Sequence, residues 1–119
     1  MAIIALYADS DVYRNRRLSS WSALTQTGLD SGEPLVLKYP NFCVQFSGTF
    51  GAGGTVLLEG SNDGISYFTL NDTQGSPLSI TAGSIKQVVE APRYIRPRVT
   101  AGDGTTAIDC IVYSRRDWD

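Results

Sequence analysis

The chain has 119 residues, 42% of them hydrophobic and 18% charged, so it fits one globular domain with a single core and not a disordered chain. Its formal net charge of −2 argues against a general nucleic-acid binder, which must neutralise many phosphates with lysine and arginine. It contains no histidine, which excludes Ser-His-Asp and Cys-His catalysis and histidine metal sites. We therefore expect no enzymatic activity and no cofactor.

Residues 1–33 have the least regular pattern. Ile3 and Ile4 begin a short apolar run suited to an edge strand, but residues 9–20 are polar and lack a period of two. The apolar run is too short and wrongly flanked for a signal peptide, and no stretch has the length of a membrane span, so we expect a protein made in the cytoplasm. A short helix at 21–25 is one alternative; we expect instead an extended amino-terminal arm anchored by Trp21, followed by a domain at residues 34–119.

The clearest structural signal lies between residues 42 and 70. Three runs rich in β-branched and aromatic residues are separated by glycine-rich residues 51–54 and by Asn-Asp-Gly at 62–64, which predicts an antiparallel meander of strands. In the first run large apolar residues alternate with smaller or polar ones, so one face of the strand is apolar. The residues that we expect in the core are Phe42, Val44, Phe46, Val56, Leu58 and Ile108.

Further strands are predicted at 34–39, 78–82, 85–90, 93–99 and 107–113. Within 93–99, Tyr94, Arg96 and Arg98 share one face, and Ile95, Pro97 and Val99 share the other. Proline cannot donate to a ladder, so Pro97 predicts an edge or a bulge. About seven or eight short strands with glycine turns predict an all-β fold, an antiparallel β-sandwich or jelly roll.

Motifs for metal, phosphate or redox chemistry are weak. Asn-Asp-Gly at 62–64 lacks the rest of a calcium loop and favours a turn, and residues 51–54 lack the Lys-Ser/Thr of a phosphate loop. Cys43 and Cys110 are outside any CxxC spacing; we expect buried free thiols, and a disulfide between neighbouring strands stays open. Most acidic residues adjoin turns, where a carboxylate caps the backbone. These residues are Glu59, Asp63, Asp72, Glu90, Asp103 and Asp109.

Aromatic residues leave two interpretations open. Tyr67 and Phe68, with Trp21 and Trp118, pack in the core or in an interface, or else they form a platform on which a sugar stacks.

Arginine outnumbers lysine eight to two and falls in three clusters. The planar guanidinium pairs with carboxylates in a fixed orientation, which suits protein interfaces; solvated clusters are the alternative. The residues that we expect to contact a partner are Arg14, Arg16, Arg17, Trp21, Arg93, Arg96 and Arg98.

Four segments together resemble a known family: Val44–Phe50, Val56–Tyr67, Pro92–Arg98 and Gly102–Gly104. Over roughly residues 42–114 the chain is similar to the head decoration, or cement, proteins of tailed bacteriophages, which have β-sandwich or jelly-roll folds. The resemblance implies a structural virion protein on the capsid surface that bridges major capsid protein subunits. It also implies a homo-oligomer, dimer or trimer, with no membrane or direct nucleic-acid partner. A tail or baseplate module and a carbohydrate-binding adhesion module are the alternatives.

Overall fold

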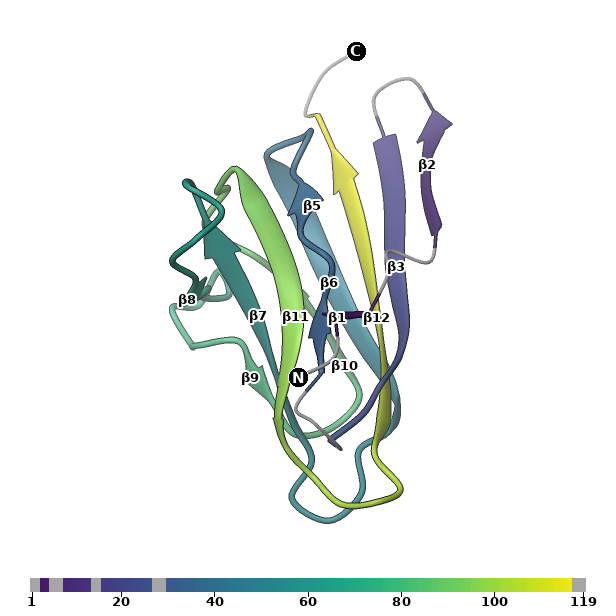
Figure 1. Cartoon of the computed structure of the whole chain (residues 1–119). Helices are drawn as coiled ribbons and strands as arrows, with labels where there is room; N and C mark the ends of the chain where they lie inside the picture. Colours follow the sequence, from purple (N-terminus) through teal and green to yellow (C-terminus); the bar gives the residue numbers. More distant parts are fainter. Residues whose placement is uncertain (1–2, 5–7, 14–15, 27–29, 117–119) are drawn as a thin grey trace.

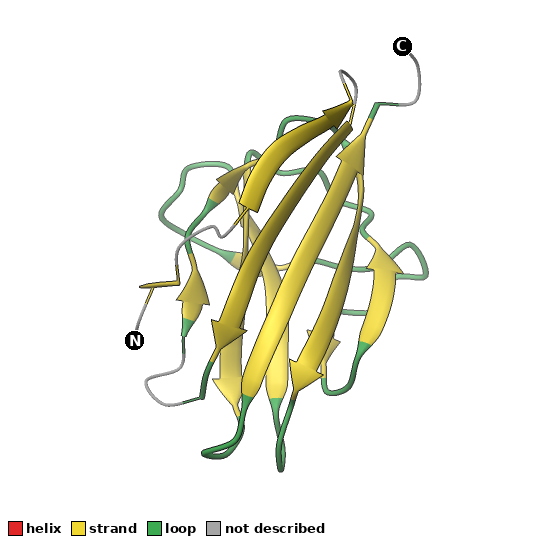
Figure 2. Cartoon of the chain, turned by 90° about the vertical axis from the view of Figure 1, so that its right-hand side faces the viewer, coloured by secondary structure: helices red, strands yellow, loops and turns green. Residues whose placement is uncertain are grey.

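Two β-sheets pack face to face in the computed structural model, which describes residues 3–4, 8–13, 16–26 and 30–116 (Figure 1). These residues form twelve strands and the loops between them (Figure 2). No helix in this part of the chain is long and apolar enough to cross a membrane. The predicted all-β sandwich is confirmed.

The smaller sheet has five antiparallel strands in the order β10-β6-β12-β3-β2. Its strands are β2 (Ala8–Tyr13), β3 (Arg16–Leu24), β6 (Asn41–Thr49), β10 (Ser84–Gln87) and β12 (Ala107–Arg115). The last strand along the chain, β12, is therefore the middle strand of this sheet.

The larger sheet has seven strands, most of them short. Its main order is β1-β4-β11-β7-β8, with β5 also beside β11 and β9 also beside β7. All its pairs are antiparallel except β1 with β4. The strands are β1 (Ile3–Ile4), β4 (Ser31–Gly32), β5 (Leu35–Val36), β7 (Thr55–Ser61), β8 (Phe68–Thr69), β9 (Ser79–Ile80) and β11 (Tyr94–Ala101).

The prediction of an extended amino-terminal arm is wrong for residues 16–24. These residues form β3, which pairs with β12 from Leu24 opposite Ile108 to Arg16 opposite Arg115. This part of the chain is an interior strand of the sandwich, flanked by β12 and β2.

The core lies between the two sheets. The six residues that the alternating pattern predicted there are all at most 2% exposed, so that prediction is confirmed. The apolar cluster consists of Trp21, Leu24, Leu35, Phe42, Val44, Phe46, Val56, Leu58, Leu70, Leu78, Ile80, Val88, Ile95, Val99, Ile108, Cys110 and Val112.

Pro97 is accommodated within β11 because its missing N–H points away from β7. Val99, two residues on, donates its N–H to the Asp30 carbonyl on the β4 side at 2.8 Å, and alternation gives Pro97 the same direction. On that side β4 and β5 are only two residues each. A Cβ on Gly32 would lie 2.6 Å from the Pro97 ring, so the proline ring and a glycine fit against each other here. The expected edge or bulge at Pro97 is therefore wrong: Pro97 pairs in register with Leu58 on an interior strand, and the irregularity in β11 lies between Val99 and Ala101.

The two cysteines lie on opposite faces of the smaller sheet and neither is in a disulfide. Cys110 is fully buried in the core, and burial raises the pKa of its thiol well above the ordinary value. Cys43 is half-buried on the outer face, opposite Tyr113. Free thiols are confirmed, but only Cys110 is buried.

Candidate functional site: an arginine-bearing sheet face

The arginines expected to contact partners divide between the two sheets. Arg96 and Arg98 lie on the outer face of β11 in the larger sheet, and Arg93 directly precedes that strand. Arg16 and Arg17 lie on β3 in the smaller sheet. The structure therefore brings only the later arginines together.

Trp21 is not a surface residue. Its side chain is 0% exposed in the core, and its indole Nε1–H donates to the Glu33 carbonyl at 2.9 Å. A partner cannot reach it, so the expected contact role of Trp21 is wrong, although it does anchor its segment. Arg14 lies outside the described residues.

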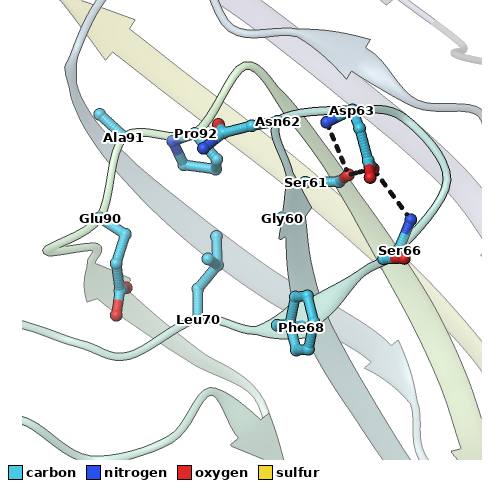
Figure 3. A pocket seen from close by; sticks show the side chains of 10 residues that line it. All are labelled: Gly60, Ser61, Asn62, Asp63, Ser66, Phe68, Leu70, Glu90, Ala91 and Pro92. Carbon is cyan, nitrogen blue, oxygen red and sulfur yellow. Dashed lines mark hydrogen bonds between the residues drawn. The ribbon is translucent and has the colours of Figure 1, made fainter.

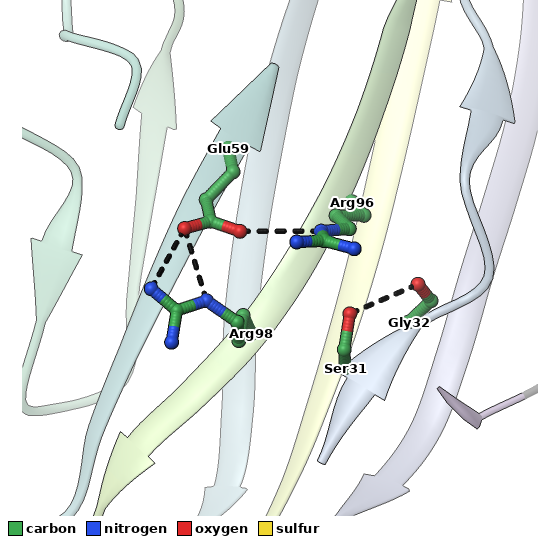
Figure 4. Close-up of polar contacts among 5 residues, drawn as sticks. All are labelled: Ser31, Gly32, Glu59, Arg96 and Arg98. Carbon is green, nitrogen blue, oxygen red and sulfur yellow. Dashed lines mark hydrogen bonds and ion pairs between the residues drawn. The ribbon is translucent and has the colours of Figure 1, made fainter. Parts of the chain in front are cut away.

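Glu59 organises the arginines of the larger sheet. Alternation along β7 places Glu59 on the outer face, and register places it directly opposite Arg96. Its Oε1 accepts from Arg96 Nε at 3.2 Å, and its Oε2 accepts from Arg98 Nε at 3.0 Å and Nη2 at 2.9 Å (Figure 4). The two guanidiniums cover the carboxylate so well that Glu59 is only 4% exposed. One carboxylate orients two cations, and the cluster keeps a net charge of +1.

Tyr67 supports the same cluster from beside it. The Arg96 guanidinium carbon lies 3.8 Å from the centroid of the Tyr67 ring, a cation–π contact that fixes the plane of the guanidinium. Burial raises the pKa of the Tyr67 phenol, although the Arg96 cation opposes this shift. The buried hydroxyl has no hydrogen-bond partner among the described residues.

The loop at 61–66 extends this surface. Asp63 Oδ1 accepts from the Ser61 hydroxyl and from the N–H groups of Ile65 and Ser66, all at 2.8 to 3.0 Å. These bonds, that from Ile65 first, lower the pKa of Asp63 to about 2. The carboxylate therefore stabilises a turn, as the sequence predicted.

A second arginine–tyrosine pair lies beside this loop. Gly64 lies against the Tyr94 ring, where an added Cβ would come within 3.3 Å. The guanidinium of Arg93 lies 5.1 Å from the centroid of the same ring. The guanidiniums of Arg93 and Arg96 therefore lie over the rings of Tyr94 and Tyr67 on the same side of the molecule.

A shallow concavity of about 560 Å³ lies next to this loop (Figure 3). Phe68 lines it and is 70% exposed. Burial disfavours ionisation of Glu90, but hydrogen bonds from the backbone and side chain of Asn71 outweigh it and lower the Glu90 pKa. The lining residues are Gly60, Ser61, Asn62, Asp63, Ser66, Phe68, Leu70, Glu90, Ala91 and Pro92.

The aromatic platform considered from the sequence is not assembled from its four members. Trp21 is in the core, Tyr67 is half-buried under Arg96, and Phe68 points to the concavity. Trp118 lies outside the described residues. Of the three described members, Phe68 alone is exposed enough to stack on a ligand.

The arrangement suits binding more than chemistry. Within residues 3–4, 8–13, 16–26 and 30–116, no three His, Cys, Asp or Glu side chains come together to hold a metal ion. What the larger sheet presents is a rigid, cationic face of arginine and tyrosine, two residue types enriched where proteins bind each other.

The fold defines the chain as a two-sheet β-sandwich, and the larger sheet carries the arginine-bearing face on its outer side. Neither a protein-family model nor a curated protein matches its sequence. Among solved structures it is similar to the SPBc2 prophage-derived protein YomS, with a TM-score of 0.60 and 16% sequence identity, over 88% of this chain and 100% of that one. This likeness shows the fold.

Proposed function

We propose that this chain is a non-enzymatic structural protein of a bacteriophage virion that decorates and stabilises the capsid by bridging major capsid protein subunits. Such a protein is made in the host cytoplasm and acts on the capsid surface. Its work is burial of surface on two or more subunits, where multivalency turns modest contacts into tight retention. The fold shared with a prophage-derived protein supports this proposal.

The observation that carries the proposal is the pre-oriented arginine face of β7 and β11. Arg96 and Arg98 are held by Glu59, and Arg96 also stacks on Tyr67. Because these side chains are already ordered, they lose little conformational entropy when a partner carboxylate binds them. Arg93 adds a further cation at the end of the same face. We expect this face to bind an acidic surface of the capsid subunit.

The test is co-sedimentation of the purified protein with undecorated capsids, followed by cryo-EM of the particles. Arg93→Glu reverses an exposed charge on the arginine face, and Lys86→Glu makes the same change on exposed β10 of the other sheet. We expect Arg93→Glu to weaken binding at least tenfold and Lys86→Glu to change it less than about twofold. Equal effects of the two substitutions would contradict the assignment of the face.

A carbohydrate-binding adhesion module is the second candidate, because Phe68 is exposed in a concavity that polar side chains also line. An exposed aromatic ring in a concavity with polar groups in its lining is an arrangement that can hold a sugar. Glycan-array binding that is lost in Phe68→Ala would favour this function over cementing. Cryo-EM density for the protein on the tail and not on the head would favour a tail or baseplate module instead.

A further inference from the structure

The outer face of the smaller sheet is uncharged across its centre. The strands of this sheet face the viewer in Figure 2. Pairing places two rows of described side chains side by side across β10, β6, β12 and β3. One row is Ile85, Gln45, Ile111 and Ser20, and the other is Gln87, Cys43, Tyr113 and Leu18; we call these eight residues the uncharged face.

Large apolar side chains are left open to solvent on the uncharged face. Ile85 is 61% exposed and Leu18 is 37% exposed, while Ile111 and Tyr113 are half-buried between them. An antiparallel sheet that faces water usually carries charged or polar residues there, as the larger sheet does with Glu59 and its arginines. Leu18, Tyr113 and Ile111 are neighbours on β3 and β12, while Gln45 separates Ile85 from Ile111. Apolar side chains gathered on an open sheet face in this way mark an interaction surface.

Opposite charges lie at the two ends of the uncharged face. Asp109 lies at one end of β12, and Arg115 lies at the other, opposite Arg16 on β3. Asp109 and Arg115 are each three residues from Val112. A two-fold axis beside Val112 therefore places Asp109 of each copy opposite Arg115 of the other copy. The same axis places Ile111 of each copy opposite Tyr113 of the other.

We propose that the uncharged face is the interface of a homodimer in which two copies pack these sheets face to face with antiparallel β12 strands. The contact is self-complementary in both hydrophobicity and charge. Aligned packing of two sheets is a common geometry, and it keeps the charged ends of the two copies together. This dimer does not depend on the arginine face, which lies on the other side of the sandwich.

The size of the whole sheet that carries the uncharged face suits a stable dimer. Three of its strands have nine residues, with β2 and β10 shorter at the edges. At ~3.4 Å per residue and ~4.8 Å between strands, the sheet has a flat footprint of about 600 Å². Its side chains raise the accessible area toward the ~800 Å² per partner of a standard interface.

Pairing through the edge of the sheet is disfavoured by Lys86. It lies on edge strand β10 opposite the core residue Val44, so alternation aims it toward the inner face, yet it is exposed. An inward-pointing lysine on an edge strand is a common device against edge-to-edge association. This disfavours a second copy at the β10 edge and leaves the broad face open to one.

The first test is sedimentation equilibrium of the full chain. We expect a dimer with a dissociation constant of about 10 µM or tighter. Leu18→Glu and Ile111→Glu each place a charge in the centre of the interface and should weaken the dimer at least 100-fold. Leu57→Glu is the control, because Leu57 is half-buried like Ile111 but lies on the outer face of the larger sheet. This variant should remain a dimer. Thermal unfolding of each variant shows whether it is folded, and Leu18→Glu tests the face even if Ile111→Glu does not fold.

The charged ends give a second, independent readout. Arg115→Glu places two acidic side chains opposite each other at both ends of the dimer, and we expect it to weaken association about tenfold at low salt and less at high salt. A monomer at about 100 µM, a trimer, or a dimer that Leu18→Glu leaves unchanged would overturn the proposal. A dimer that forms but does not bind capsids would count against the proposed function and not against this interface.

Discussion

The carboxylate of Glu59 lies between two guanidiniums, and both of its oxygens accept hydrogen bonds from them. The arginine side chains are 20% and 31% exposed, so water reaches them but screens the pairs only in part. Removing the carboxylate would leave two cations side by side without a counter-charge. The outer face of the larger sheet therefore depends on one residue for its geometry.

We expect Glu59→Gln to lower the free energy of unfolding by about 2 kcal/mol, since charge-assisted hydrogen bonds to a buried group are lost while the shape is kept. Urea denaturation measures it. Lys86→Gln removes one charge at an exposed site and should change stability by less than about 0.5 kcal/mol. A Glu59→Gln loss no larger than that of this control would mean that the cluster does not stabilise the fold.

Ala23 is the described non-glycine residue with a positive φ, 57°, in a bulge where two residues of β3 face Asp109 of β12. Asp109 Oδ1 accepts the Ala23 N–H at 2.8 Å and holds this conformation. A branched side chain is less compatible with the left-handed region than alanine is, whereas glycine adopts it without strain.

We therefore predict that Ala23→Val destabilises the protein by about 1–2 kcal/mol and that Ala23→Gly does not. The midpoints of urea denaturation for the two variants and the wild type give the order directly. Because Ala23 is exposed, lost burial cannot explain a loss in the valine variant. If valine is tolerated as well as glycine, the backbone at this position is not constrained.

At the scale of elements, the two loops that connect the sheets at one end of the sandwich, 50–54 between β6 and β7 and 102–106 between β11 and β12, are tied together by Asp103 and Thr106. Asp103 accepts from the Ala52 N–H at 2.9 Å, and also from the N–H and hydroxyl of Thr105. The Thr106 hydroxyl donates to the Phe50 carbonyl at 2.7 Å. The hydrogen bonds that the Asp103 carboxylate accepts, that from the Ala52 N–H first, lower the pKa of Asp103 from 3.8 to about 2.

This pKa predicts a pH dependence. A carboxyl group with a lowered pKa in the folded state contributes stability above about pH 4, and the contribution is lost as pH falls toward about 2. We expect Asp103→Asn to lower the thermal midpoint near neutral pH and to make its fall between pH 4 and pH 2 shallower. Asp63→Asn should do the same, because Asp63 has a similarly lowered pKa. An unchanged slope in both variants would mean that these carboxylates titrate alike in the folded and unfolded chain.

The strands that were predictable from sequence are those with an uninterrupted period of two. The strands predicted at 93–99 and 107–113 correspond to β11 and β12. Alternation correctly grouped Tyr94, Arg96 and Arg98 on one face of β11, and Ile108 of β12 is in the core as predicted. β3 was missed because its bulge breaks the period: Trp21 and Leu24 are three residues apart, yet both point into the core. Ser19 of β3 is also buried, so a polar residue lies on the inner face and the sequence pattern of this strand did not look apolar on either side.

The site was predictable only in part, for a related reason. Alternation placed Arg96 and Arg98 on one face, but it gave no indication that β7 is the neighbour of β11. Glu59 therefore looked like one more carboxylate near a turn. Strand pairing depends on contacts between distant parts of the chain, and a single sequence does not reveal which runs meet.

At the scale of the whole molecule, β3 belongs to the sandwich, so we expect a protein that lacks part of this strand to be unstable. A variant lacking residues 1–20 loses more than half of β3, and with it much of the pairing along β12. It would also expose one side of β12, the middle strand of the smaller sheet.

We expect this variant to show no cooperative unfolding transition in circular dichroism, whereas Leu18→Glu, which keeps the strand, should still unfold cooperatively. A truncated protein with the wild-type midpoint would show that the remaining strands form a stable sandwich without most of β3.

The position of β12 also bears on how the protein folds during synthesis. β6 and β3 flank β12 in the sheet, yet both are made long before it, so neither has its main partner until most of the chain has emerged from the ribosome. Pairings between such distant segments fold slowly, in milliseconds to seconds, because a long loop must close first. Until then the apolar side of β6 is open to the solvent and to other nascent chains. The nascent chain is therefore most open to association with other chains, and most in need of chaperones, during the interval before β12 is complete.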